Sequence, residues 1–207
     1  MIRAGSNGNG TGFVAGGNFQ ALAALNPDGS RMDTGGSDLR IRIAGGLKVC
    51  IHPGDWIGTE PGQNSGPVKQ GLNARFGDYS GGLSATAYPP DRNVQEGITY
   101  AQYRSAASGS TYFQAPSSGT GQANRRVIII PIINNNEFNA GRDKVRLYDL
   151  GAFFLSTKVG NGQGNITAEY IGGGYETVGA KNDPTFVPVM PDNGGRVRVI
   201  SKTSTVK

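Results

Sequence analysis

Apolar and polar residues alternate in short runs along the chain, and each run predicts a β-strand. In Leu39–Ile43 every second residue is apolar and the two residues between are arginines, which is the pattern of a strand with one buried face. Residues 47–51, LKVCI, form a second apolar run after the pair Gly45 and Gly46. Two such runs joined by a short glycine-containing link predict a β-hairpin.

The strongest strand signals lie in the second half of the chain. Residues 126–133, RVIIIPII, are apolar at both parities and predict a strand that is buried on both faces. Because Pro131 has no backbone N–H, we expect a bulge or an unpaired edge there. Residues 144–160 and 165–173 predict two more strands, and short loops favour an antiparallel meander. The tail adds up to two further strands, in VPVMP and RVRVISK.

A short helix is predicted within GDWIGTEPGQNSGPVKQGLNAR, residues 54–75, and just beyond it. Val68, Leu72 and Phe76 recur at helical spacing, and Gly77 can end the helix in a left-handed conformation. The residues before it predict an irregular crossing, with Trp56 in the core and polar side chains satisfying unpaired backbone groups. The residues assigned to this structural motif are Gly54, Asp55, Trp56, Glu60, Pro61, Gly62, Gly66, Pro67 and Gln70.

The remaining segments are rich in turn residues. Residues 1–17 predict a flexible Gly/Asn-rich lead-in with room for one short strand, and residues 18–25 predict either a short helix or a strand. NPDGS at residues 26–30 predicts a turn. Residues 78–124 predict an irregular, loop-rich insertion, in which ITYAQYR and TYFQ are candidate short strands.

Taken together, these patterns predict one mainly β domain over residues 18–207. We expect an antiparallel β-sandwich or barrel-like fold with one or two short helices and long glycine-rich loops.

Composition limits the classes of function. Glycine contributes 34 of the 207 residues without a G-X-Y period, which excludes collagen and fits turns and bulges. Charged residues make up 17%, below the usual share of about 25%, which favours an extracellular or assembled protein. No apolar run reaches the length of a membrane helix, so no membrane insertion by this chain is expected. The start of the sequence does not resemble a signal peptide, so export would require a targeting segment outside it.

The formal net charge of +5 raises the question of a nucleic-acid partner. The basic residues are spread out, mostly at alternate positions, which is typical of the water-facing side of strands. They are Arg40, Arg42, Arg125, Arg126, Arg142, Lys144, Arg146, Arg196 and Arg198. No run of five basic residues and no nucleic-acid-binding motif occurs, so no nucleic acid is expected as a partner.

Few residues form a pattern that could carry chemistry. Asp55 and Glu60 are the best carboxylate pair, since a tight loop could place them at the roughly 5–10 Å that glycoside hydrolysis uses, but structural roles are the favoured interpretation. Cys50 and His52 share one face of a predicted strand without a third catalytic group, and two ligands are too few for a structural zinc site. Residues 134–143 lack calcium-loop spacing and leave only a weak ion site open. We therefore expect no catalytic residue, no metal and no cofactor.

Aromatic residues concentrate in the middle third of the chain. Besides Trp56, they are Tyr79, Tyr88, Tyr100, Tyr103, Tyr112 and Phe113. They could form a sugar- or peptide-binding surface, although strand packing is the favoured interpretation.

Three blocks of sequence, taken in order, resemble the TadE/TadG-like Flp (Tad) pilus assembly proteins. They are GGNFQALAAL at 16–25, CIHPGDWIGTEPGQNSGPVKQGLNARF at 50–76, and the apolar strands with AFFL and a glycine-rich close at 125–173. The resemblance implies an exported, membrane-tethered minor pilin or assembly factor without catalytic residues. Such proteins carry an N-terminal hydrophobic helix, which this sequence lacks, so the tether would precede Met1 or be absent.

The expected function is therefore that of a non-enzymatic structural or interaction domain of a bacterial surface pilus or filament assembly. Its expected partners are other pilus or filament subunits or copies of itself, and its expected location is extracellular or at the cell surface. Two alternatives stay open: a carbohydrate- or peptide-binding module that uses the 78–124 loops, and a viral or self-assembling coat subunit. An enzyme that uses Asp55 and Glu60 is the weakest hypothesis.

Overall fold

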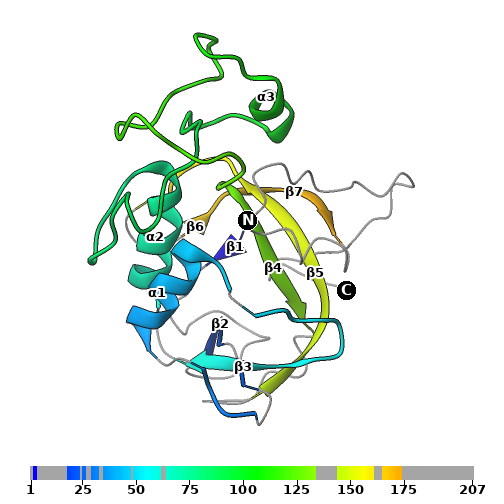
Figure 1. The fold of residues 1–207 in the computed structure, drawn as a ribbon. Helices are drawn as coiled ribbons and strands as arrows, with labels where there is room; N and C mark the ends of the chain where they lie inside the picture. The colour runs from blue at the N-terminus through cyan, green and yellow to red at the C-terminus, as the bar shows by residue number, and fades with distance from the viewer. Residues whose placement is uncertain are drawn as a thin grey trace.

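The computed structural model describes residues 2–3, 18–23, 25–26, 29–32, 35–47, 49–61, 64–133, 144–160 and 165–173. Within them, strands predominate over short helices (Figure 1). The strands are β1 (Ile2–Arg3), β2 (Asn18–Ala23), β3 (Trp56–Pro61), β4 (Val127–Ile133), β5 (Lys144–Leu155), β6 (Asn165–Ile166) and β7 (Ala168–Gly173). The helices are α1 (Gly36–Gly45), α2 (Ser65–Asn73), the 3-10 turn Ala74–Phe76 and α3 (Tyr100–Ser105).

The long strand β5 organises a five-stranded antiparallel sheet in the order β2-β3-β5-β4, with β7 also paired to β5. β4 runs along one edge of β5, while β3 pairs with its first residues and β7 with its last. A separate two-stranded sheet joins β1 to β6. The antiparallel, mainly β character is thus confirmed, but the sheet is open, and the described residues show neither a sandwich nor a closed barrel.

The predicted meander is confirmed, because β4 and β7 both pair antiparallel with β5. The register of β4 shifts between Ile132 and Ile133, next to Pro131, and among the described strands β4 pairs only with β5. The prediction that the 126–133 strand is buried on both faces is wrong, because every residue of β4 is only half-buried. The strand that is buried on both faces is β5, from Leu150 to its end.

The predicted hairpin at residues 39–51 is wrong. Leu39–Ile43 lies within helix α1, and no strand occupies the described residues from 47 to 51. Leu39 and Ile43 satisfy a helical spacing as well as alternation, and both pack in the cluster that includes α2. The helix packs closely because Gly71 of α2 lacks a side chain: a Cβ there would lie 2.7 Å from the Cβ of Ile43.

The predicted helix is confirmed as α2 and the 3-10 turn that follows it. Val68, Leu72 and Phe76 are buried, and Gly77 ends the turn with a left-handed φ of 82°. These side chains pack against Leu155 at the end of β5, so α1 and α2 cover one side of the sheet (Figure 1).

Residues 78–124 form a loop-rich excursion from the sheet, and the strands predicted within it are wrong. ITYAQYR includes all of helix α3 except its last residue, and Thr99 and Gln102 cap this helix reciprocally. TYFQ lies in a turn and the loop that follows it. Figure 1 shows the part of this excursion around α3 as a lobe that projects from the rest of the domain, while its first residues run beside α2.

Other segments give a mixed result. Residues 18–25 contain strand β2, and the turn at 26–30 is confirmed by the Gly29 N–H donating to the Asn26 carbonyl at 2.8 Å. Strand β1 lies within the predicted lead-in. The predictions for residues 4–17, for the 134–143 loop and for the tail from residue 174 fall outside the described residues.

Candidate functional site

The turn before β3 fastens the predicted structural motif to β5. Gly54 has a left-handed φ of 97°, and its N–H donates to the Leu147 carbonyl at 2.7 Å. The Leu147 N–H donates in return to the Asp55 carbonyl at 2.8 Å, and the Asp55 carboxylate accepts from the His52 N–H at 2.7 Å. Asp55 therefore satisfies the backbone of its own turn, and the predicted crossing continues as a regular strand.

Asp55 and Glu60 do not form a carboxylate pair. The Glu60 carboxylate is buried, where it forms an ion pair with Arg31 at 2.7 Å and accepts from the Gly35 N–H at 3.4 Å. Five residues of strand separate the two acids by about 16 Å, beyond the roughly 5–10 Å of glycosidase carboxyl pairs. Arg31 also donates to the Thr59 carbonyl, so Glu60 anchors the Arg31 segment to β3.

The remaining motif residues have structural positions. Gln70 accepts from the Arg40 guanidinium at 3.2 Å and thereby links α2 to α1. Gly66 and Pro67 lie in the first turn of α2, where the proline nitrogen needs no partner. The backbone of Pro61 pairs with Asn18, and Gly62 lies outside the described residues.

Trp56 is the clearest error of the sequence analysis. Its side chain is 56% exposed, so it does not fill the core. Trp56 pairs across the ladder with Arg146, whose guanidinium carbon lies 5.5 Å from the centre of the indole ring. Tyr148, two residues further along β5, is 76% exposed. The opposite face of this part of the sheet is buried, through Ile57, Val145 and Leu147.

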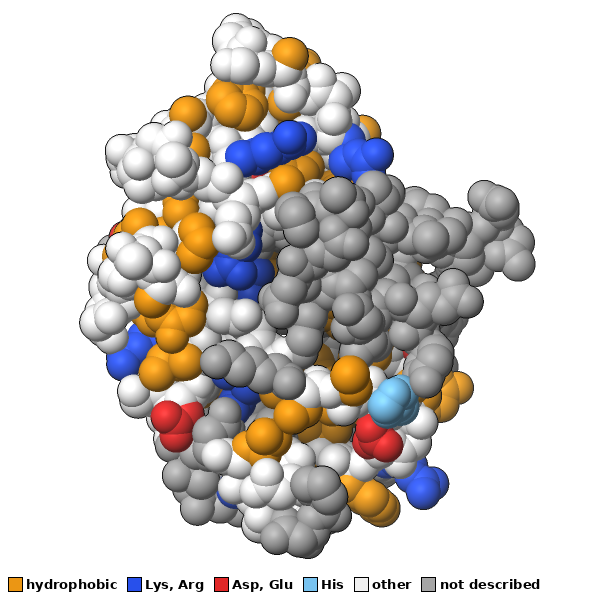
Figure 2. Space-filling view, viewed as in Figure 1, with side chains coloured by type: hydrophobic (Ala, Val, Ile, Leu, Met, Phe, Trp, Pro, Cys, Tyr) orange, Lys and Arg blue, Asp and Glu red, His pale blue; other side chains and the backbone are white. Residues whose placement is uncertain are grey.

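We call the exposed side chains of Trp56, Arg146 and Tyr148 the aromatic rim. Lys144 lies on the same exposed face of β5 because it is two residues from Arg146. Trp56 and Tyr148 are diagonal neighbours across the strand pair, a relation that places residues about 7–8 Å apart. Figure 2 shows part of this end of the molecule at the lower right, where basic and hydrophobic side chains lie near the histidine.

The aromatic residues of 78–124 do not share one exposed surface. Tyr79 and Tyr88 pack against the cluster of Ala44, Ala74 and Leu83, and the Tyr79 hydroxyl donates to the Tyr88 carbonyl at 2.8 Å. Tyr100 and Tyr103 belong to a different cluster with Phe154. Tyr112 is exposed and Phe113 is half-buried in the projecting lobe. These aromatic residues lie in separate clusters, so they do not together form the sugar- or peptide-binding surface that the sequence suggested.

A buried arginine, Arg126, joins the loop excursion to the sheet, contrary to the prediction from sequence. Arg126 is fully buried, and its guanidinium lies between the rings of Phe76 and Phe154, at 4.6 and 4.5 Å from their centres. Its nitrogens donate to four carbonyls, those of Leu155, Asn93, Gln95 and Ser156, at 2.8–3.1 Å. Arg126 was assigned to a water-facing strand surface, and that assignment is wrong.

Asp91 is a buried carboxyl group that binds the backbone of Arg126. It accepts from the backbone N–H groups of Asn93 and Arg126 and from the Tyr103 hydroxyl, at 2.9–3.1 Å. Burial raises the pKa of Asp91, an effect that these hydrogen bonds oppose. Burial also lowers the pKa of Arg126 to about 10, so Arg126 keeps its charge at neutral pH. These polar groups have structural roles, since the Asp91 carboxyl oxygens and the Arg126 side-chain nitrogens all form hydrogen bonds with main-chain groups or with Tyr103.

Two further arginines hold the end of α1. Arg75 is buried and donates to the Ile43 carbonyl at 2.6 Å and to the Arg125 carbonyl at 2.6 Å. Arg125 donates in turn to the carbonyls of Ala44 and Pro89. The last carbonyls of a helix have no partner within the helix, so these guanidinium groups supply the missing donors. Burial lowers the pKa of Arg75 to about 9.

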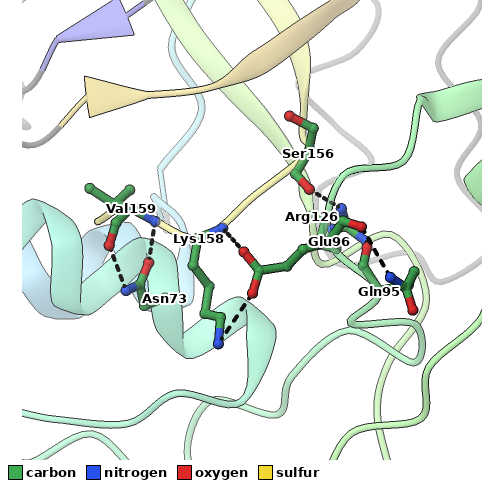
Figure 3. A network of polar contacts seen from close by, with 7 residues as sticks. All are labelled: Asn73, Gln95, Glu96, Arg126, Ser156, Lys158 and Val159. Carbon is green, nitrogen blue, oxygen red and sulfur yellow. Dashed lines mark hydrogen bonds and ion pairs between the residues drawn. The ribbon is translucent and has the colours of Figure 1, made fainter. Parts of the chain in front are cut away.

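The segment that leaves β5 is tied down by side chains from three places (Figure 3). The Asn73 amide donates to the Val159 carbonyl at 3.0 Å and accepts from the Val159 N–H at 2.8 Å. The Glu96 carboxylate accepts from the Lys158 N–H at 2.8 Å and pairs with the Lys158 ammonium at 3.3 Å. Arg126 completes the set through Ser156. These contacts fix the excursion relative to the sheet.

A sequence signal for Arg126 existed. An arginine directly before an all-apolar run has no polar face to occupy, so its burial could have been suspected from RVIIIPII. The residues that bind Arg126 could not have been predicted from the sequence pattern, because Asp91, Asn93 and Gln95 lie in a segment without hydrophobic periodicity.

Cys50 and His52 are both exposed, and His52 lies 3.5 Å from the Asp55 carboxylate. Across the described ranges, no three His, Cys, Asp or Glu side chains are grouped to hold a metal ion. No helix among the described residues has the length and apolarity needed to cross a bilayer. Comparison of the chain with family models, curated proteins and solved structures finds no match.

Proposed function

We propose that this chain is a non-enzymatic interaction domain of a bacterial surface pilus or filament assembly, located at the cell surface, and that it acts through protein–protein contacts. The resemblance to TadE/TadG-like proteins supports a role in a pilus or filament assembly. The three resembling blocks lie together in space. β2 from the first block pairs with β3 from the second, β3 pairs with β5 from the third, and α2 packs on the end of β5.

The observation that carries the proposal is the exposure of the aromatic rim. Trp56 is the single tryptophan of the chain, and tryptophan is usually largely buried. An exposed Trp and Tyr, with an Arg over the Trp ring, match the residue types enriched in protein interfaces and their energetic centres. A surface of this composition is suited to contact with another subunit.

The buried polar groups support a non-enzymatic role. The buried side chains that would be candidates for chemistry are bound elsewhere. Arg126 donates to main-chain carbonyls, Asp91 accepts from main-chain N–H groups and the Tyr103 hydroxyl, and Glu60 pairs with Arg31. Asp55 and Glu60 serve separate structural contacts. The working surface is therefore proposed to be a contact surface.

The test is complementation in the cell that makes the protein. The gene would be deleted and restored with an epitope-tagged copy that is wild type, Trp56→Ala with Tyr148→Ala, or Tyr112→Ala as a matched exposed aromatic from the projecting lobe. Surface filaments would be counted by negative-stain microscopy, and the tag located by immunogold labelling. Circular dichroism of each purified variant would establish that it folds.

We expect deletion to reduce surface filaments and the tag to label the filaments or their bases. The rim double variant should fail to restore filament number, whereas Tyr112→Ala should restore it. Unchanged filaments after deletion, together with label inside the cell, would contradict the proposal.

A further inference from the structure

The aromatic rim offers a contact that is both aromatic and basic. Lys144 and Arg146 lie on the exposed face of β5, and Tyr148 follows them at the same alternate spacing. Arg146 lies against Trp56, so the indole has its cation next to it on the surface. The carboxylate of Asp55, in the turn before β3, lies 3.5 Å from the His52 ring nitrogen and accepts from the His52 N–H.

A second copy of the chain is a poor electrostatic match for this rim. The chain carries a net charge of +5 and a sequence pI of about 9.4, so two copies repel at neutral pH. Most carboxylates in the described part of the chain are already engaged within it. Glu60 pairs with Arg31, Asp91 binds the Arg126 segment, Glu96 pairs with Lys158, and Glu169 accepts from the Tyr100 N–H at 2.7 Å.

We propose that the aromatic rim docks a different subunit of the same assembly, one whose contacting surface is acidic and receives Trp56 as the buried anchor. This inference rests on the proposed function and specifies the partner. Opposite charge on the partner would guide association and fix its orientation. Burial of the indole and of Tyr148 would supply most of the affinity, because large aromatic side chains dominate interface energies.

A protein partner fits the geometry better than an acidic polysaccharide. Sugar rings stack on a free aromatic face, but the Arg146 guanidinium lies over the Trp56 ring at 5.5 Å. A guanidinium beside an indole is suited to a carboxylate at the edge of an apolar contact, as in Arg- and Trp-centred protein interfaces. A polysaccharide remains a distinguishable outcome of the experiment.

The experiment places the photo-cross-linking residue p-benzoylphenylalanine at position 148 in the full chain, within cells that make the filaments. The matched control carries the same residue at position 112, which is an exposed tyrosine of the projecting lobe. After irradiation, the adducts are isolated through the tag and identified by mass spectrometry. A second pair of strains adds Trp56→Ala or Arg146→Glu.

We expect one protein adduct from position 148 and not from position 112, formed with a subunit that has a net negative charge. Its yield should fall about ten-fold or more with Trp56→Ala, as for loss of an interface anchor. Arg146→Glu should lower it as well, because it repels an acidic surface. A higher adduct yield from the Arg146→Glu strain at high salt would agree with charge repulsion as the cause of its loss.

Each other result would overturn the inference. An adduct of two copies of this chain would assign the rim to self-association. A glycosidase-sensitive smear would assign it to a polysaccharide, and a non-acidic partner or an adduct indifferent to Trp56→Ala would remove the proposed contact. If no adduct forms while immunogold still labels the filaments, the docking inference fails and the proposed function stands.

Discussion

Replacement of Arg126 by methionine tests how the loop excursion is held to the sheet. Methionine keeps much of the side-chain length between Phe76 and Phe154 but removes every donor. The change would leave the carbonyls of Leu155, Asn93, Gln95 and Ser156 without this guanidinium.

The magnitude follows from those contacts. A hydrogen bond to a charged group contributes about 1.5–3 kcal/mol, and an orphaned buried acceptor costs about 1–3 kcal/mol. The four bonds share one guanidinium and are not additive, so we take the cost of breaking a buried charged network, about 3–5 kcal/mol. That is a large share of the 5–15 kcal/mol that stabilises an ordinary domain.

The assay is urea unfolding followed by circular dichroism, with Arg104→Met as the control, because Arg104 is an exposed arginine on α3. The control should change the free energy of unfolding by no more than about 0.5 kcal/mol. Arg126→Lys should recover only part of the loss, since an ammonium cannot reach four carbonyls in the plane of a guanidinium. An Arg126→Met unfolding free energy within about 0.5 kcal/mol of wild type would refute the structural role of this residue.

Three further predictions concern stability. Gly71→Ala should cost about 1–3 kcal/mol by separating α1 from α2, whereas Gly66→Ala, where an added Cβ meets nothing within 4 Å, should be neutral or stabilising in thermal melts; equal effects would remove the close-packing argument. Trp56→Ala should cost less than about 1 kcal/mol, as for an exposed cross-strand pair, and a loss of about 3–5 kcal/mol would mean that the ring is buried. Because burial raises the pKa of Asp91, its stabilising contribution is present below the unfolded pKa and is lost as pH rises through the folded pKa. The gap in unfolding free energy between wild type and Asp91→Asn should therefore narrow from about pH 4 upward, and a gap that widens would have the wrong sign.

The strands of the sheet were predictable from sequence because their signals are local. The runs that became β4, β5 and β7 are apolar enough and close enough along the chain to predict both strand and antiparallel pairing. The helix α2 was predictable for the same reason, since Val68, Leu72 and Phe76 leave only one face to bury.

The errors occurred where the deciding contact is distant in sequence. Leu39–Ile43 fits both a strand and a helix, and the choice is made by Gly71, which lets α2 approach, and by Arg75 and Arg125, which bind the last carbonyls of α1. None of these residues is near the segment in sequence, so periodicity alone could not decide between the two forms.

In the candidate site, too, the positions of Trp56 and Arg126 depend on contacts that are distant in sequence. Trp56 was expected in the core because large aromatic side chains usually lie there, but its face of β3 is set by the pairing with Arg146. The burial of Arg126 depends on acceptors from the excursion and from the end of β5. The prediction that 54–75 has a structural role therefore holds for Asp55 and Glu60, while the exposed face of the motif was missed.

The central claim is that Trp56 is a contact residue that becomes covered on assembly. Hydroxyl-radical footprinting with mass spectrometry measures the oxidation of the peptide that carries Trp56, in the free chain and in intact filaments. We predict rapid oxidation in the free chain, where the side chain is 56% exposed, and protection of about ten-fold or more in filaments, with Tyr112 labelled equally in both. Equal oxidation of Trp56 in the two states would contradict the account.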